Sequence, residues 1–246
     1  ARVERGLDAR QARDRLLDPV KVLDILIADA LELARLTGVK TALDSGNTEI
    51  PPQRWLTSEH LTDTAGDLRE RVEEIDYNFV TVLSQSDAAA QTGQPADEQS
   101  TALLERVREA EPLIAAGAAK LAAAKDELEQ GRVRESLEPQ YEAITKLAAA
   151  RESFLDLQRL IELLHEEEKR IETIVSPKEE KPAAEKSEYA SLAADAQRTN
   201  TARVPHVERS LKEEIAAADA TIAAKAAEEA AAQQQAQQGG AAAPPT

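Results

Sequence analysis

The stretch SEHLTDTAGDLRERVEEIDYNFVTV, residues 58–82, decides the fold. Its apolar side chains recur at alternating intervals of four and three residues, at Leu61, Ala65, Leu68, Val72, Ile75, Phe79 and Val82. This spacing is typical of a helix that packs through a narrow apolar seam, as in a coiled coil. Just before the seam, Thr57 is placed to cap the helix and Leu56 to pack on Leu61.

Residues 18–38, which precede this helix, predict another helix that is apolar on more than one face. Asp18 and Pro19 begin it, as a capping carboxylate followed by a proline in the first turn. Gly38 is expected to end it, because glycine commonly follows the last turn of a helix. Loops are expected over residues 39–56, which contain SGNTEIPP, and over residues 84–99, which contain TGQPADEQ.

Two more seams follow toward the C-terminus. The first covers residues 103–128, and Gly117 lets a neighbouring helix approach it closely. Because the seam keeps its phase through Pro112, we expect a kink there rather than an end. Gly131 ends this helix, and a second seam predicts one long helix that ends near Val175. Its apolar positions are Tyr141, Ile144, Leu147, Ala150, Phe154, Leu157, Ile161, Leu164 and Ile171.

The composition changes after residue 176. We expect a helical bundle domain over residues 1–175, a charged linker over 176–186, a looser helical segment over 187–232 and a disordered tail over 233–246. Pro205 is expected to interrupt the helical segment, whose last seam is Val207, Leu211, Ile215, Ala218 and Ile222.

Residues 187–204 resemble residues 58–72 in the order of their Ser-Glu, Leu, Ala, Asp and Arg residues. One interpretation is that residues 187–232 begin a second repeat unit, in a natural chain that continues past Thr246. The alternative is chance similarity between Ala-rich helices.

The composition agrees with this organisation. The chain has 246 residues, of which 42% are hydrophobic and only 2% aromatic, and the good helix formers Ala, Glu and Leu are abundant. Such a composition is typical of long helices that pack through thin apolar seams, and it disfavours a thick core. We therefore predict an all-α fold, an antiparallel bundle of four long helices over residues 18–175 with coiled-coil-like packing.

Several classes of protein are disfavoured. The formal net charge of −16 argues against binding to nucleic acids or anionic lipids, which attract Lys and Arg. Without Cys, the chain has no disulfide, no thiolate nucleophile and no Cys-ligated metal. No run reaches the ~18 apolar residues of a transmembrane helix. A signal or anchor upstream of Ala1 stays open, because the sequence does not begin with Met.

No pattern of catalytic or metal-binding residues stands out. His60, His165 and His206 are far apart, and the acidic residues beside His165 fan around the helix instead of converging on one ion. The chain has neither a glycine-rich phosphate loop nor a nucleophile elbow. We expect no enzyme, no cofactor and no metal; a helical bundle that senses a ligand or metal is kept as a distant alternative.

Two side chains are candidates for contact with a protein partner. Trp55, the only Trp, either covers one end of the bundle, which we favour, or anchors a partner from an exposed position. Arg151 lies beside a seam. Either its stem covers apolar surface while its head reaches water, which we favour, or it pairs with an acid of another helix and sets the register.

Lys120–Ala150 resembles a degenerate tetratricopeptide hairpin, with Gly131 at the turn and Ser136, Tyr141 and Ala143 on the second helix. Over residues 18–175 the chain is also similar to bacterial envelope proteins with helical repeats. These are encoded near Bat-type proteins with von Willebrand A-domains. This resemblance implies a helical scaffold that is exported or tethered to a membrane.

The leading functional hypothesis is therefore a non-enzymatic scaffold or adaptor for protein–protein interaction in the cell envelope or periplasm. The cytoplasm is the alternative location. A self-assembling coiled-coil protein is the runner-up, in which residues 187–232 pair with another copy as a homo-oligomer.

Overall fold

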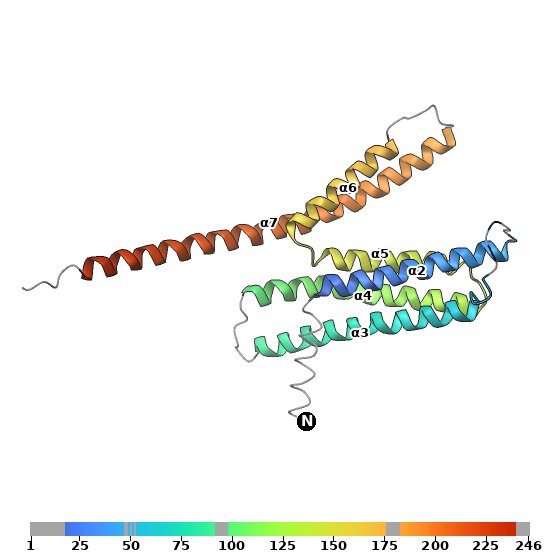
Figure 1. The fold of residues 1–246 in the computed structure, drawn as a ribbon, viewed down its shortest axis with the longest axis horizontal. Coiled ribbons are helices and arrows are strands. Elements are labelled where there is room, and N and C mark those ends of the chain that lie inside the picture. Colours follow the sequence, from blue (N-terminus) through green and yellow to red (C-terminus); the bar gives the residue numbers. More distant parts are fainter. Residues whose placement is uncertain are drawn as a thin grey trace, which may run out of the picture. The chain divides into compact units, whose positions relative to one another are not determined.

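The computed structural model describes residues 18–46, 49, 51, 53–91, 98–175 and 183–239. Every regular element within these ranges is an α-helix, as predicted (Figure 1). The chain divides into two compact units, Ala1–Leu155 and Asp156–Thr246, which are considered separately below.

The first unit is a bundle of four helices: α2 (Pro19–Asp44), α3 (Ser58–Gln91), α4 (Glu98–Glu129) and α5 (Leu137–Glu152). Each helix contacts two others in a ring, α3 with α4, α4 with α5, α5 with α2, and α2 with α3. The start of α5 meets the end of α2, where Gln140 donates a hydrogen bond to Thr37 (3.1 Å). The end of α5 meets the start of α2, where Arg151 pairs with Asp24. These two helices are thus antiparallel, as predicted.

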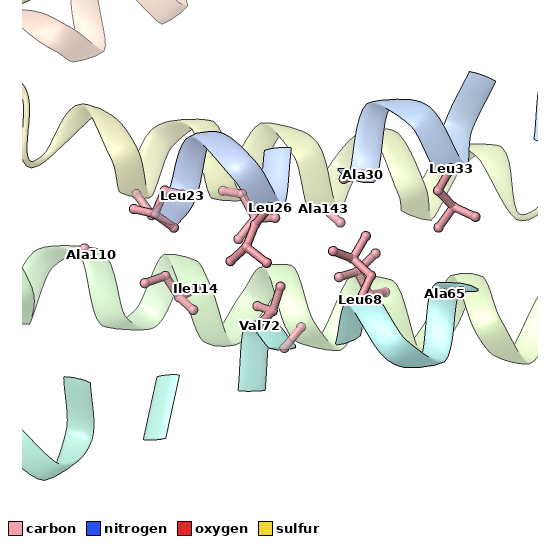
Figure 2. Close-up of a cluster of buried hydrophobic side chains, with 14 of the residues drawn as sticks. Leu23, Leu26, Ala30, Leu33, Ala65, Leu68, Val72, Ala110, Ile114 and Ala143 are labelled. Atoms are coloured by element: carbon pink, nitrogen blue, oxygen red, sulfur yellow. The ribbon is translucent and has the colours of Figure 1, made fainter. Parts of the chain in front are cut away.

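The core of the bundle consists mainly of Leu and Ala. Figure 2 shows residues from all four helices gathered in its interior, among them Leu23 and Leu26 of α2, Leu68 of α3, Ile114 of α4 and Ala143 of α5. The seam predicted over residues 58–82 is confirmed. Its members Leu61, Ala65, Leu68, Val72 and Phe79 are buried, and Ile75 and Val82 are partly buried against the same cluster.

Local signals in the sequence begin and end these helices as predicted. Asp18 Oδ1 accepts a hydrogen bond from the backbone N–H of Lys21 (3.0 Å), and Thr57 Oγ1 accepts one from the backbone N–H of His60 (3.1 Å). After α4, Gly131 adopts a left-handed conformation with φ of 73°. Helix α4 also continues through Pro112, which does not end it.

Two helices run further than predicted. Helix α2 continues past Gly38 to Asp44, and α3 continues through the first part of the predicted loop to Gln91. A glycine in a helix costs only about 1 kcal/mol relative to Ala, which local contacts can offset. Beyond Gly38, Val39 packs against the core and Lys40 pairs with Asp44.

The prediction of one long helix is wrong, because the chain turns at residues 153–156 and a second helix follows. The predicted end near Val175 is confirmed. Phe154 is buried there with its ring edge-on to Phe79, at a centroid distance of 5.7 Å. Asp156 Oδ1 then accepts a hydrogen bond from the backbone N–H of Arg159 (2.8 Å), which caps a new helix. The first unit accordingly ends at Leu155 and not at residue 175.

The positions of two predicted seam residues are also corrected. Tyr141 and Ile161 are exposed, whereas Gln140, Ala143 and Leu160 are buried. Gln140 lies in the bundle because its amide donates hydrogen bonds to both Thr37 and Ser136, at 3.1 Å each. A seam assigned from apolar residues alone does not detect such a buried polar position.

The second unit consists of α6 (Leu157–Val175) and α7 (Ala183–Gly239), and α6 packs along the first half of α7 (Figure 1). Asn200 of α7 is buried and donates hydrogen bonds to Glu168 (2.9 Å) and to the Leu164 carbonyl (3.4 Å) of α6. Helix α7 passes through Pro205 without ending, contrary to our expectation. Arg203 and Ser210, on either side of this proline, are both buried, so the helix is packed on both sides of the residue that costs it a hydrogen bond.

The predicted boundaries in the C-terminal part are corrected as well. Helix α7 begins at Ala183, within the predicted linker, and it continues to Gly239, within the predicted disordered tail. The rest of the linker, residues 176–182, and the rest of the tail, residues 240–246, lie outside the described residues.

The close approach of α4 and α5 gives a test of the packing. A Cβ added at Gly117 would lie 3.2 Å from Leu147 Cδ2, whereas a Cβ added at Gly38 would meet nothing within 4 Å. Gly117→Leu is therefore expected to lower the free energy of unfolding by about 1–3 kcal/mol through overpacking. Gly38→Leu, the matched control, is expected to leave it unchanged or raised, because Leu favours the helix. Urea unfolding of both variants measures this, and equal losses would contradict the account.

Candidate interaction surfaces

Trp55 lies at the end of the bundle where α2 gives way to α3. Its side chain is 55% exposed, and its ring meets that of His60 edge-on at a centroid distance of 5.4 Å. The expectation that Trp55 covers this end of the bundle is wrong. Leu56 and Val133 are buried in the core at this end instead, and they leave the indole outside. The second interpretation, an exposed Trp available to a partner, fits this position.

Arg151 is placed between helices of the bundle. Its guanidinium pairs with Asp24 of α2, and Nε is buried without an aligned hydrogen bond to the carboxylate. The alternative interpretation, a pair with an acid of another helix, describes this contact, while 31% of the Arg151 side chain stays exposed to solvent. As a half-exposed ion pair it contributes about 0.2–1 kcal/mol and helps fix the register of α5 on α2.

The described part of the chain contains no group of three or more His, Cys, Asp or Glu residues placed to hold a metal ion. Asp76 of α3 lies in an electrostatically unfavourable position, since its Oδ1 is buried without a hydrogen-bond partner. Burial, and after it the nearby carboxylates of Glu111 and Glu73, raise the pKa of Asp76. A buried carboxylate without a hydrogen-bond partner costs free energy of folding, so Asp76 bears on stability.

Another exposed surface lies on the C-terminal part of α7, past the stretch that packs against α6. Of the seam predicted there from the sequence, Val207 is partly buried, whereas Leu211, Ile215, Ala218 and Ile222 are exposed. Leu211 is 47% exposed, Ile215 53% and Ile222 65%. The described side chains from residue 211 to 231 are exposed, apart from Glu213, which is partly buried. The spacing of apolar residues predicted this line from the sequence, but spacing alone could not show whether other parts of the chain bury it.

Comparison with known proteins adds no relative. The chain matches no known family, no curated protein and no solved structure. The resemblance to tetratricopeptide hairpins and to envelope proteins therefore stays a prediction. Among the described residues, no helix is long and apolar enough to cross a membrane.

The contrast between two adjacent residues tests the assignment of Trp55 to the surface. Trp55→Ala is expected to change the free energy of unfolding by less than about 1 kcal/mol, because the ring is mostly exposed. Leu56→Ala, the matched variant, removes a side chain that is only 3% exposed and should cost about 2–5 kcal/mol. Urea unfolding followed by circular dichroism compares them. A larger loss for Trp55→Ala than for Leu56→Ala would place the indole in the core.

The raised pKa of Asp76 predicts a pH dependence of stability. Because its pKa in the folded chain lies above the ordinary value of 3.8, the folded state holds this proton more tightly than the unfolded state does. As the pH rises from the ordinary pKa through the raised pKa of the folded chain, ionisation of Asp76 lowers the free energy of unfolding. This loss is complete at neutral pH. Asp76→Asn should raise the melting temperature at pH 7, and the gain should shrink as the pH falls toward about 4.

Asp67→Asn is the control for this experiment, since Asp67 is exposed on the same helix and its substitution changes the net charge equally. The two variants are compared by thermal unfolding across the pH range. An Asp76→Asn gain that does not vary with pH, or that Asp67→Asn reproduces, would contradict the electrostatic assignment.

Proposed function

We propose that this protein is a non-enzymatic helical scaffold that binds a protein partner through the end of the bundle carrying Trp55. The observation that supports this is the exposure of the indole. A large aromatic ring lies 55% exposed while smaller apolar residues close the same end of the core. Trp is enriched among the residues that dominate protein–protein binding.

The surroundings of Trp55 are suited to such a role. The neighbouring Leu56 is fixed in the core, and the first turn of α3 is capped by Thr57, so the backbone that carries the indole is anchored. An anchored aromatic side chain loses little conformational entropy when it binds. The acidic character of the whole chain favours a partner with a basic contact surface.

The cell envelope is the proposed location, on the basis of the resemblance to envelope proteins over residues 18–175. The absence of Cys is compatible with an exported protein but also with a cytoplasmic one. The identity of the captured partner therefore bears on the location as well as on the function.

Affinity capture from the native host after mild crosslinking tests the proposal, with the full chain as bait. Trp55→Ala should lose a protein that the unsubstituted chain recovers reproducibly. Tyr141→Ala is the matched control, because Tyr141 is also 55% exposed on the bundle, and it should retain that protein. Equal recovery by all three baits would overturn the role of Trp55. A partner confined to the cytoplasm would overturn the proposed location.

A further inference from the structure

We propose that the exposed stripe of α7 pairs with the same stripe of a second copy of this chain, in antiparallel orientation. The stripe consists of Val204, Glu208, Leu211, Ile215, Ala218, Ile222 and Lys225, which follow one another at intervals of four and three residues. Its four large apolar members are each at least 45% exposed. This surface is distinct from the end of the bundle assigned to a protein partner above.

The stripe is separate from the face of α7 that α6 already covers. Among the α7 side chains that the structure describes, the buried ones are Ala193, Asn200, Arg203 and Ser210, which recur on their own line along the helix. Leu211 lies one residue beyond Ser210, which places it about 100° around the helix from the covered face. An α-helix whose apolar line has no partner is only marginally stable in water. A second helix laid along the stripe would remove that line from solvent.

Charge selects the orientation and register of the second copy. In antiparallel pairing with Ile215 opposite Ala218 of the other copy, Leu211 meets Ile222, and Glu208 meets Lys225. Each of these contacts occurs twice because the pair is symmetric. On the flank of the seam, Lys212 lies near Asp219 of the second copy, again twice. Ile215 thus meets the small Ala218, Leu211 meets Ile222 and opposite charges meet, while Val204 at the end of the stripe lies opposite Glu229.

Other arrangements of the same stripe bring like charges together. In a parallel, in-register pair, Glu208 would face Glu208, Lys225 would face Lys225, and Glu214 would lie near Asp219. Shifting the antiparallel pair by one heptad, with Leu211 opposite Ile215, would place Lys212 near Lys212 and Glu214 near Glu214. Since like charges at these flanking positions destabilise pairing, the sequence of α7 favours the first register.

Cysteine crosslinking tests the orientation directly, because the chain has no natural Cys. Leu211→Cys and Ile222→Cys, mixed and oxidised in the full chain, should form a disulfide between the two variants. Neither variant should crosslink with itself, because in this register two copies of residue 211 lie roughly 16 Å apart along the helix axis. A disulfide requires Cα atoms within about 7 Å. Self-crosslinking of Leu211→Cys would indicate a parallel pair or the shifted antiparallel one, and either would overturn the proposal.

Charge reversal provides a second, reversible readout by sedimentation velocity across about a hundredfold range of concentration. Lys212→Glu and Asp219→Lys should each weaken the dimer, and the double variant should restore it, because each reversed residue again meets an opposite charge. In a parallel pair, Asp219→Lys would instead strengthen the dimer by facing Glu214.

A double substitution within the stripe, Ile215→Asp with Ile222→Asp, should abolish the dimer. The matched control, Ala216→Asp with Ala223→Asp, lies exposed on another face of α7 and should retain the dimer.

The outcomes separate this proposal from the adaptor function. A chain that remains monomeric at every concentration, with no crosslink between the two cysteine variants, overturns self-pairing. A dimer that persists in the Ile215→Asp, Ile222→Asp variant overturns the assignment of the stripe. Both results leave the Trp55-dependent capture unaffected, since that surface belongs to the bundle.

Discussion

The structure depends above all on the close approach of helices across a core built of Leu and Ala. With few aromatic residues to fill space, the helices of the bundle must lie near one another, and small residues permit this. Gly117 permits one such approach, since Leu147 and the Ala143 carbonyl of α5 occupy the space a side chain would need. The packing of α4 against α5 depends on this close approach.

Periodicity and capping signals predicted most of the bundle from the sequence. The seam of residues 58–82, the caps at Asp18 and Thr57, and the turn at Gly131 are all local features, and each is confirmed. The break at residues 153–156 escaped prediction because the apolar spacing continues through it. Its cause is tertiary, the burial of Phe154 against Phe79. For the same reason, the sequence could name Trp55 and Arg151 as candidates but not their surroundings, which depend on Leu56, Val133 and Asp24.

The two units present their apolar residues in different ways. In the bundle, α2 to α5 bury a shared core, while single side chains such as Ile25 and Leu31 stay exposed on its outside, as Trp55 does at one end. In the second unit, α6 covers only part of α7, so the same heptad pattern that makes a core in the bundle makes a surface there. A helix face of this kind is a means of assembly when its charges select one orientation of the partner.

Amide hydrogen exchange of the full chain at low and high protein concentration tests the central claim most directly. If the stripe of α7 pairs with a second copy, amides between residues 204 and 229 gain protection as the concentration rises, because pairing suppresses opening of a stretch whose side chains are mostly exposed in one copy. Amides of α3, already covered within the bundle, serve as the internal reference and stay unchanged. Protection of α7 that is the same at both concentrations would contradict the account.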